Sequence, residues 1–583
     1  MKPHYILGLS CFYHDSAACL LKDGVVVAAA QEERFTRKKH DSDFPKNAVN
    51  YCLSEAGISV SELAYVAYYE KSFTKFDRIL TTHLCTAPRG LLSFLKAMPV
   101  WLRQKLWISS IIKKELKFDG TIIYPEHHEA HAASTFFCSP FKSAAIMTLD
   151  GVGEWSTATC GFGENNKINL THEIRFPHSL GLLYSAFTYF LGFKVNSGEY
   201  KVMGLAPYGN PQYYNLIMDK LIDVKEDGSF QLNLKYFSFV HGLRMTGRKF
   251  EELLGRKKRS KEARLTQDDF DVASSIQKVT EEVVLRIAKH LRKETGMKYL
   301  CLAGGVALNC VANGRILREA GFHDIYIQPA AGDAGGALGA ASFAYYSVLN
   351  NERNLPVMKM PYVGPEYLQG DIKQALDERG AVYHEYLTHE LLKKTAVLLC
   401  EQNIIGWFQG RMEFGPRALG GRSILADPRD PKMKDKVNLK IKFRESFRPF
   451  APTILEEHVN EYFELNRPSP YMLLVAPVRE NKRVIPAITH VDGSARIQTI
   501  SKEDHPLYYN LIKEFHELSG VPVLINTSFN VRGEPIVGSP HDAYNCFMGT
   551  NMDYLVIGNY ILNKKEQKDR QEFKNWHETF PLD

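Results

Sequence analysis

The sequence predicts an α/β protein with a two-lobed N-terminal domain followed by a separate α/β C-terminal domain. A strand, a turn carrying an aspartate and a return strand rich in small residues occur twice, at residues 5–21 and 144–160. Two strand–glycine-loop–helix units follow, at residues 300–320 and 325–339. A duplicated plan of this kind, joined to glycine loops, is typical of two lobes with a nucleotide between them.

The first sixty residues predict three strands and a helix, over residues 5–12, 16–21, 25–31 and 46–57. The turn before the second strand carries His14 and Asp15, and a Lys-Asp-Gly hairpin turn precedes the third. Residues 32–40, between the third strand and the helix, form a charged segment dense in Arg and Lys. Such a segment fits a solvated loop, and it equally fits a loop that faces phosphate.

Residues 84–118 mix apolar and basic side chains at helical spacing. A helix lying on a membrane surface would show this pattern, and so would a helical insertion packed on its own domain. Pro99 interrupts the pattern and no sustained polar face is present, which favours the packed insertion. Residues 70–118 and 230–265 contain no recognisable motif, and we expect them to form lids or walls of a substrate site.

The middle of the chain contains one candidate functional loop and a domain boundary. Residues 196–210 are punctuated by Gly and Pro and predict a functional loop, with a plain connector as the alternative. Residues 267–296 predict a long amphipathic helix that ends at a glycine. A polar, Pro-containing stretch at residues 350–362 divides the chain into predicted domains of residues 1–352 and 363–583.

Three segments of the C-terminal domain place Arg, Lys, Ser or Asn beside Gly or Pro turns, at residues 406–423, 440–450 and 526–535. Guanidinium groups bind phosphate and planar carbamoyl-type groups through paired hydrogen bonds. Any one segment also fits arginines exposed on helices. Three in one domain favour a pocket for an anionic ligand.

Four residues form a candidate metal site. His127 and His131 stand one helical turn apart, which on its own also fits surface histidines at a helix N-terminus. Asp150 at a strand end and Asp333 in a glycine-rich turn supply the missing carboxylates. Two imidazoles and two carboxylates suit Fe(II) or another divalent ion. The order His-His-Glu-Ala-His differs from the zinc-protease motif, and we expect neither His128 nor Glu129 to be a ligand.

Composition excludes several classes of protein. The formal net charge of +6 is too small to indicate a nucleic-acid partner. The ten cysteines form no C-x-x-C pair, which argues against a disulfide framework or a zinc ribbon. The N-terminus runs straight into a strand pattern and no apolar run reaches spanning length. We therefore expect a cytoplasmic, reduced protein without a membrane span, and no pattern indicates an oligomeric state.

At these residues the chain resembles the nodulation/antibiotic-type O-carbamoyltransferase family. The shared motifs run through nearly the whole chain: Tyr13-His14-Asp15, Glu33-Arg-Phe-Thr-Arg-Lys-Lys39, His127-x-x-x-His131, Leu149-Asp-Gly, Lys201-Val-Met-Gly-Leu, Ala303-Gly-Gly, Gly332-Asp-Ala-Gly-Gly, Phe414-Gly-Pro-Arg, Phe447-Arg-Pro-Phe and Asn526-Thr-Ser-Phe-Asn. The resemblance implies an N-terminal domain of the actin/sugar-kinase ATPase type and a YrdC-like C-terminal domain.

The resemblance also implies a reaction. The C-terminal domain would join carbamoyl phosphate to ATP, giving carbamoyl-adenylate and pyrophosphate, with Mg²⁺ as an additional cation. The N-terminal domain would then move the carbamoyl group to a hydroxyl of a small-molecule acceptor, such as a sugar, an antibiotic or another natural product, and release AMP.

Motif matching assigns residues to these steps. His14 looks like the base that takes the acceptor proton, and His127, His131, Asp150 and Asp333 look like iron ligands. Contacts to the adenylate are implied for Lys39, Gly304, Gly305 and Asn309. Contacts to carbamoyl phosphate and ATP are implied for Arg417, Lys442, Arg444, Ser528, Asn530 and Arg532. Phe12 departs from an aminoglycoside-modifying relative, which has an acidic residue there, and this argues against an aminoglycoside acceptor.

Three other functions are weighed against this one. A carbamoyl-activating enzyme acting on a protein, of the hydrogenase-maturation kind, carries C-x-x-C zinc fingers and the opposite domain order. A transferase acting on tRNA lacks the second domain and needs a basic face. A non-enzymatic, ATP-gated binding module explains the glycine loops and leaves the metal set and the second domain unexplained.

Overall fold

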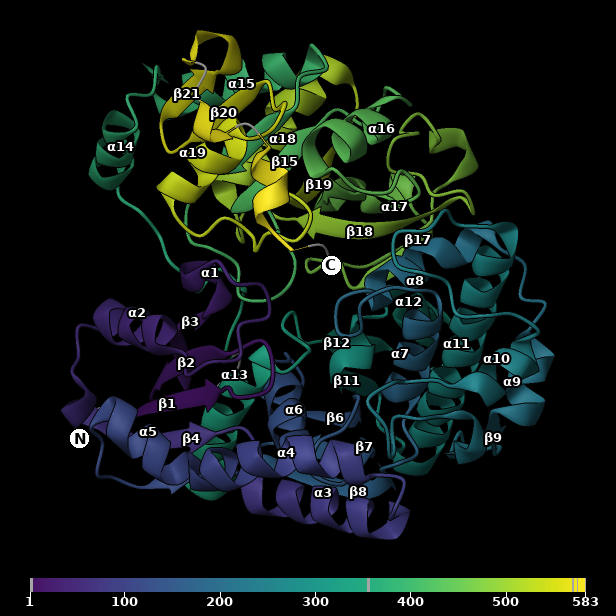
Figure 1. Cartoon of the computed structure of the whole chain (residues 1–583). Coiled ribbons are helices and arrows are strands. Elements are labelled where there is room, and N and C mark those ends of the chain that lie inside the picture. Colours follow the sequence, from purple (N-terminus) through teal and green to yellow (C-terminus); the bar gives the residue numbers. More distant parts are fainter. Residues whose placement is uncertain (1–3, 354–356, 569–570, 574, 582–583) are drawn as a thin grey trace. The chain divides into compact units, whose positions relative to one another are not determined.

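The computed structural model describes residues 4–353, 357–568, 571–573 and 575–581, which form two compact units (Figure 1). Unit 1 comprises residues 1–32 and 40–359, and unit 2 comprises residues 33–39 and 360–583. The division at residue 359 falls inside the stretch predicted as a linker. The short segment Glu33–Lys39, which the sequence-based assignment includes in the N-terminal domain, packs instead with unit 2.

Unit 1 is built on two five-stranded sheets with the same strand order. In each sheet the first strand pairs antiparallel with a hairpin of two strands on one side and parallel with two later strands on the other. The strands are β1 (Tyr5–Ser10), β2 (Ala17–Lys22), β3 (Val25–Gln31), β4 (Leu63–Tyr68) and β5 (Ile122–Ile123), then β6 (Ser143–Leu149), β7 (Ser156–Glu164), β8 (Lys167–Arg175), β11 (Tyr299–Ala303) and β12 (Asp324–Ile327). The predicted duplication and α/β class are confirmed.

Helices cover these sheets, and capping residues determine where the longest of them begins and ends. The long helix α11 (Gln267–Thr295) starts at a capping box on Thr266 and stops at Gly296, whose φ of 66° is left-handed. The other helices of the sheet layers are α2 (Lys46–Ala56), α6 (His127–Phe136), α7 (Leu180–Phe190), α8 (Glu199–Leu205), α9 (Tyr214–Lys220), α10 (Arg248–Leu254), α12 (Cys310–Glu319) and α13 (Ala334–Ser342). A small hairpin, β9 (Ile222–Val224) with β10 (Phe230–Leu232), lies among them.

Helices α6 and α13 approach each other unusually closely, and α13 also packs on β1 and β2. A Cβ atom on Gly339 of α13 would lie 1.8 Å from the carbonyl oxygen of Ala130 in α6. On the other side, a Cβ on Gly8 of β1 would lie 1.9 Å from the carbonyl oxygen of Ala337. Only glycine permits backbones to meet at these distances. The small residues of α13 therefore fix where α6 sits.

Two segments differ from the sequence-based expectation. Residues 196–210 contain helix α8 and a 3-10 turn, Ala206–Tyr208, in place of an open loop. The insertion forms α3 (Ser72–Thr86), α4 (Leu91–Arg103) and α5 (Ile108–Leu116), and Pro99 lies inside α4 without ending it. A proline removes one helical hydrogen bond, and Leu95, whose carbonyl would accept that bond, is exposed.

Unit 2 is organised around a nine-stranded mixed sheet in the order β13-β21-β20-β14-β15-β19-β16-β18-β17. Its strands are β13 (His384–Glu385), β14 (Ile405–Phe408), β15 (Arg422–Ala426), β16 (Ala451–Leu455), β17 (Leu474–Pro477), β18 (Ser494–Ile500), β19 (Val523–Ser528), β20 (Tyr554–Ile557) and β21 (Tyr560–Asn563). Its helices are α1 (Glu33–Thr36), α14 (Gln369–Glu378), α15 (Thr388–Cys400), α16 (Met433–Val437), α17 (Val459–Tyr462), α18 (Pro506–Ser519) and α19 (Pro540–Met548). An apolar cluster of α15 and α18 residues, including Leu399 and Phe515, packs around Trp407 of the sheet.

The α6–α13 contact can be tested with Gly339→Ala. The added methyl group has no room, so we expect the free energy of unfolding of unit 1 to fall by about 1–3 kcal/mol, the usual range for overpacking. Urea denaturation followed by intrinsic fluorescence measures the change. Gly370→Ala is the matched control, because a Cβ there meets nothing within 4 Å, and it should not destabilise the protein. Equal stability of Gly339→Ala and wild type would contradict the close packing.

Candidate functional site

Helix α6 presents its histidines inward, and the way it begins explains why. The backbone N–H of Glu126 donates to the Glu129 carboxylate at 2.7 Å, which completes a capping box. The backbone N–H of His127 donates to both oxygens of Glu154, at 3.1 and 3.0 Å. Glu129 thus has a capping role, and both His127 and His131 are 1% exposed. The alternative of surface histidines is wrong.

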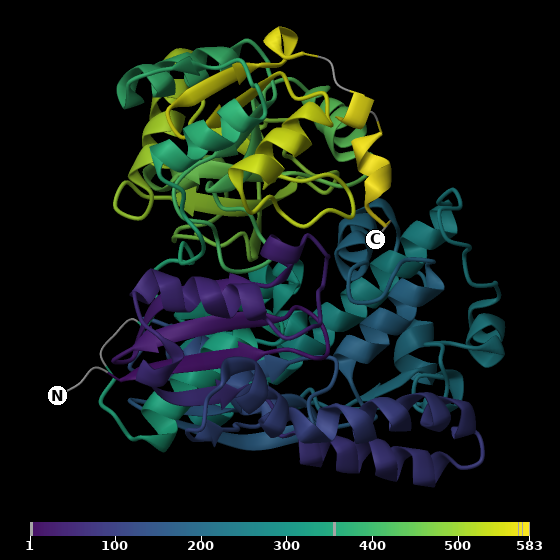
Figure 2. The ribbon, with the colours of Figure 1, turned by 60° about the vertical axis from the view of Figure 1, so that its left-hand side comes forward.

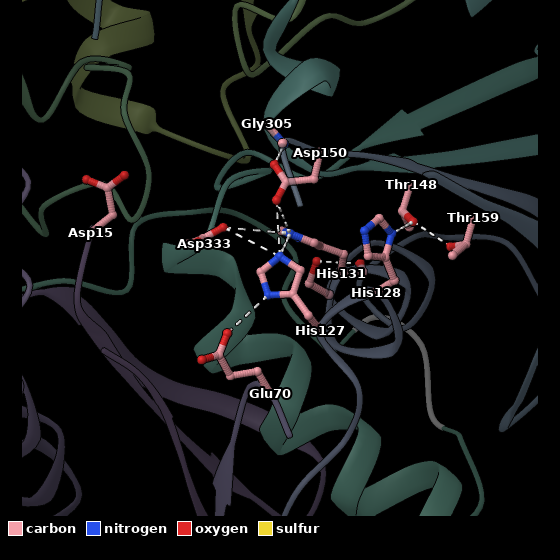
Figure 3. A network of polar contacts seen from close by, with 12 residues as sticks. Asp15, Glu70, His127, His128, His131, Thr148, Asp150, Thr159, Gly305 and Asp333 are labelled. Carbon is pink, nitrogen blue, oxygen red and sulfur yellow. Dashed lines mark hydrogen bonds and ion pairs between the residues drawn. The ribbon is translucent and has the colours of Figure 1, made fainter. Parts of the chain in front are cut away.

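The predicted metal set comes together in one place (Figure 3). The Nε2 atoms of His127 and His131 are 3.0 Å apart, and His127 Nε2 lies 3.1 Å from Asp150 Oδ2. Asp333 Oδ1 lies 3.7 Å from His127 Nε2 and 3.9 Å from His131 Nε2. All four ligand atoms lie within 4.8 Å of one another. His128 points away and its Nδ1 shares a hydrogen bond with the Thr148 hydroxyl, at 2.6 Å.

This geometry fits a divalent cation. Two donors bound at right angles to a cation about 2.1 Å away lie about 3.0 Å apart, and opposite donors about 4.2 Å apart. The donor–donor distances given above, 3.0 to 3.9 Å, lie within the interval from about 3.0 to about 4.2 Å. In addition, Nδ1 of His127, the nitrogen turned away from the cluster, lies 3.9 Å from Oε2 of Glu70. A carboxylate behind the far nitrogen is the arrangement that orients a metal-binding histidine.

The environment of the cluster is buried and rich in carboxylates. Burial would raise the pKa of Asp150, but hydrogen bonds to His127 and His131 outweigh it and hold the pKa well below its usual range. Burial raises the pKa of Asp333 to about 6. Burial also raises the pKa of Glu154 to about 7. Carboxylates crowded together in this way are stabilised by a cation among them.

His14 lies at the edge of this cluster, in the β1–β2 turn. Its Nε2 is 3.7 Å from Asp333 Oδ2, and its Nδ1 is 2.9 Å from Asp15 Oδ2. Asp15 also lies 2.7 Å from Nδ1 of His40. Burial would lower the pKa of His14, but Asp333 and Asp15 outweigh it and raise the pKa to about 9. Asp15 is placed to hold a proton on Nδ1, which leaves Nε2 as the nitrogen that can accept one.

The glycine loop after β11 packs against the end of β6 and donates a hydrogen bond to Asp150. Gly304 has a φ of 90°, and a Cβ there would lie 2.2 Å from the carbonyl oxygen of Leu149. The backbone N–H of Gly305 donates to Asp150 Oδ1 at 2.9 Å. Asn309 caps α12 through the N–H of Ala312 and exchanges two hydrogen bonds with Gln277. These three residues thus order the loop beside Asp150, and their implied contacts to the adenylate stay a prediction.

The predicted residues of unit 2 gather around a buried lysine. Lys442 is 2% exposed, and its ammonium donates to the carbonyl oxygen of Ser528 at 2.5 Å and to the side-chain oxygen of Asn530 at 2.6 Å. The Ser528 hydroxyl donates to the same Asn530 oxygen at 2.8 Å. Burial and the neighbouring Arg444 lower the pKa of Lys442 well below its usual range. A buried ammonium whose hydrogen-bond partners are neutral oxygens has no opposite charge beside it, and an anionic ligand can supply that charge.

Other cations adjoin Lys442. Arg444 donates from Nε to the Asn438 side chain at 2.8 Å, and Arg532 lies 3.8 Å from Glu445. Lys39 is close enough for its charge to contribute to the lowered pKa of Lys442. Lys39 therefore belongs to unit 2 and adjoins its cation group, and its implied contact to the adenylate stays a prediction. Arg417 is half-buried in the loop between β14 and β15.

Sequence reasoning missed three residues of the unit 1 site: Glu70, Glu154 and His40. Glu70 follows β4, at the carboxyl end of a strand parallel to β1, which is where functional side chains collect in such sheets. Glu154 lies in the β6–β7 turn, four residues after Asp150. Their positions after the ends of predicted strands could have identified Glu70 and Glu154 as candidate site residues. His40 carries no comparable signal, because its contact with Asp15 depends on the path of the preceding loop.

Comparisons with known proteins place the chain among carbamoyltransferases. The family described as Carbamoyltransferase N-terminus matches residues 5–342, and the family described as Carbamoyltransferase C-terminus matches residues 396–564. The uncharacterized protein sll1178 of Synechocystis sp. is 54% identical over 99% of this chain and 100% of its own length. Nodulation protein NolNO of Sinorhizobium fredii is 38% identical over 95% of this chain and 79% of its own length. Nodulation protein U of Rhizobium tropici is 30% identical over 95% of each.

Solved structures give weaker matches. Full-length HypF in its phosphate- and nucleotide-bound form aligns with a TM-score of 0.31 and 15% identity, over 60% of this chain and 56% of that one. Component A of the Acidaminococcus fermentans (R)-2-hydroxyglutaryl-CoA dehydratase aligns with a TM-score of 0.29 and 14% identity, over 59% of this chain and 99% of that one. Similarity at this level supports no further conclusion. Among the described helices, none has both the length and the apolarity needed to cross a bilayer.

The metal site can be tested with Asp333→Asn, which keeps the shape of the side chain and removes its charge. We expect the affinity for Fe(II) or Co(II) to fall by about 10–100-fold or more, because loss even of a supporting carboxylate has that effect. Metal content by mass spectrometry and the rise in melting temperature on adding metal provide the readouts. Asp219→Asn, at an exposed aspartate of α9, is the control and should retain the metal. Unchanged metal content in Asp333→Asn would exclude Asp333 as a ligand.

Proposed function

The chain belongs to the carbamoyltransferase family, and we propose that it is an ATP-dependent O-carbamoyltransferase that works through carbamoyl-adenylate. Unit 2 activates carbamoyl phosphate with ATP, and unit 1 transfers the carbamoyl group to a hydroxyl of a small-molecule acceptor. One observation carries the proposal. The Asp15–His14 pair adjoins a four-donor cluster in the unit that matches the N-terminal carbamoyltransferase family.

Activation uses the cations around Lys442. Carbamoyl phosphate, ATP and one water give carbamoyl-adenylate, pyrophosphate and orthophosphate, so the site handles phosphate groups on both substrates and products. Lys442, Arg444 and Arg532 supply positive charge at fixed positions, and Ser528 and Asn530 hold the ammonium of Lys442 in place. Fixed cations in a dry site stabilise the charge that develops during phosphoryl and adenylyl transfer. Mg²⁺ would accompany the ATP.

Transfer uses His14. The acceptor hydroxyl gives its proton to Nε2 of His14 while its oxygen attacks the carbamoyl carbon, and the bond from that carbon to the AMP oxygen breaks. Asp15, 2.9 Å from Nδ1, fixes the tautomer that leaves Nε2 free and stabilises the imidazolium that forms. A base must be neutral before it acts, and the carboxylates that raise the pKa of His14 are Asp333 of the candidate metal set and Asp15.

A divalent cation, Fe(II) in our proposal, is held by His127, His131, Asp150 and Asp333. When bound, it supplies positive charge that balances the two carboxylates and acts as a Lewis acid beside the reacting group. The surrounding residues contribute independently of it. Gly305 orients Asp150, and Glu154 holds the first turn of α6, so the site is organised by the protein itself.

The acceptor site adjoins Tyr13, which stands next to His14 at 4.6 Å between ring centres. The ammonium of Lys75 lies 4.9 Å from the Tyr13 ring centre, and that of Lys105 lies 5.8 Å from it. Both lysines come from the 70–118 insertion, which supports its proposed role as a wall of the acceptor site. Lysines on this wall, with Phe12 in place of an acidic residue, disfavour a cationic acceptor.

The central test incubates the protein with carbamoyl phosphate, ATP and a panel of sugars and other alcohols. We expect pyrophosphate to form only when carbamoyl phosphate is present, and AMP with a carbamoylated product when a suitable alcohol is added. Mass spectrometry identifies the product. Absence of carbamoyl-dependent pyrophosphate would refute the proposal, and carbamoylation of an added protein or tRNA in place of the alcohols would change the acceptor class.

The division of labour can be tested with His14→Ala. We expect transfer to fall by about 10²–10⁴-fold, the usual contribution of a general base, while carbamoyl-dependent pyrophosphate formation is retained. The exposed His172→Ala variant on β8 is the control and should retain both activities. Loss of both half-reactions in His14→Ala would show that the two units do not divide the work as proposed.

The lowered pKa of Lys442 predicts a pH dependence of substrate binding. A lysine is charged below its pKa, so Lys442 loses its charge at a lower pH than an ordinary lysine as the pH rises. We expect the affinity for carbamoyl phosphate, measured by calorimetry, to weaken from neutral to alkaline pH. Lys442→Met should bind weakly at every pH, and Lys440→Met, at an exposed lysine nearby, should behave as wild type. An affinity independent of both pH and Lys442 would remove this residue from the site.

A further inference from the structure

The 70–118 insertion exposes an unusual number of large apolar side chains. Eight of the twenty exposed large hydrophobic residues in the described chain lie between residues 73 and 107. These are Phe73, Leu84, Leu91, Leu92, Leu95, Val100, Leu102 and Trp107. In both whole-chain views, α3 and α4 run side by side along an outer edge of unit 1 (Figures 1 and 2). A concentration of this kind marks an interaction surface.

Helix α4 is apolar on its buried side and on the exposed stripe that adjoins it. Its inner face buries Met98 and Trp101, and the Trp101 ring packs against Phe76 of α3 at 5.7 Å between centres. Its outer face carries Leu91, Leu92, Leu95 and Leu102, which are between 56% and 73% exposed. These positions fall on one stripe of an α-helix. The packed-insertion interpretation therefore accounts for the inner face and leaves the outer face unexplained.

The same segment carries the net charge of the protein. Residues 84–117 contain seven basic residues against one acidic residue, Glu115, for a net charge of +6. The whole chain also has a formal net charge of +6. The basic residues are Arg89, Lys96, Arg103, Lys105, Lys113, Lys114 and Lys117. Elsewhere, the positive and negative charges balance.

Cations border the leucine stripe directly. By helical angle, Lys96 and Arg103 lie next to the stripe on its outer side, and both are exposed. Trp107 follows shortly after α4 and is 57% exposed. Its indole N–H donates a hydrogen bond to the carbonyl oxygen of Leu102 at 2.8 Å. Leucines flanked by Lys and Arg, with a tryptophan at the boundary, are typical of helices that lie at a lipid–water interface.

We propose that the outer face of α4, defined by Leu91, Leu92, Leu95, Leu102, Lys96 and Arg103, docks unit 1 on the surface of an anionic phospholipid bilayer. The leucines enter the interfacial layer, and the basic side chains bind lipid phosphates. Lipid is favoured over a protein partner because the stripe lies on the outside of a helix and not in a groove. The clustered positive charge also matches an anionic surface, with each such residue adding to the attraction. This proposal is independent of the transfer chemistry.

Sedimentation with lipid vesicles tests the proposal on the full-length protein. We expect binding to vesicles containing about 30% phosphatidylglycerol, loss of binding as salt is raised, and little binding to pure phosphatidylcholine. A double variant, Leu92→Glu with Leu95→Glu, should bind the anionic vesicles at least about tenfold more weakly, because it puts carboxylates into the inserting stripe. Both positions are exposed, so the fold and carbamoyl-dependent pyrophosphate formation should be unchanged.

The matched control is Leu368→Glu with Leu387→Glu, which alters two leucines of unit 2 that are 75% and 65% exposed. It should bind vesicles as wild type does. Failure of the wild type to bind anionic vesicles at low salt, or equal binding by both double variants, would overturn the proposal. So would a wild-type dimer that Leu92→Glu with Leu95→Glu converts to a monomer without lipid, because the face would then be an interface between copies of this chain.

Discussion

The close contact between α6 and α13 is the constraint on which the unit 1 site depends. Glycines at the contact let two backbones approach at distances that any side chain would prevent. As a result, His127 and His131 on α6 face Asp333, which stands immediately before α13. The same helix α13 packs on the first sheet, whose β1–β2 turn carries His14. A single tight helix pair thus sets the positions of the ligand set and the candidate base together.

Charge is the second organising feature of this site. Asp333, Glu70 and Glu154 are buried beside the half-buried Asp150, and Lys75 pairs with Glu70. Burying a carboxylate is costly unless a hydrogen bond or a cation compensates. Two of the four receive backbone N–H groups, since Gly305 donates to Asp150 and His127 donates to Glu154. The remaining negative charge is what a divalent ion would neutralise, so the environment and the donor set point to the same chemistry.

Much of this could be predicted from the sequence, for identifiable reasons. The duplicated sheets were visible because alternating strands and Gly turns leave a local pattern, and α11 was visible because both of its ends carry capping signals. The metal set could be predicted because helical spacing and strand ends are local features too. The packing of residues 33–39 with unit 2 could not be predicted, since nothing local in the sequence shows it. The cap that Asn309 provides for α12 was not predicted, because a helix cap and a ligand contact use the same side chain.

The two matching sheets give this protein two versions of one hairpin turn. The turn after β1 carries His14 and Asp15, and the turn after β6 carries Asp150 and Glu154. One copy is equipped to move a proton, and the other to hold a cation and anchor a helix. Because the copies are encoded separately, a substitution in one leaves the other intact. In the proposed reaction, substitutions around His14 can therefore change acceptor preference while the turn that carries Asp150 keeps its sequence.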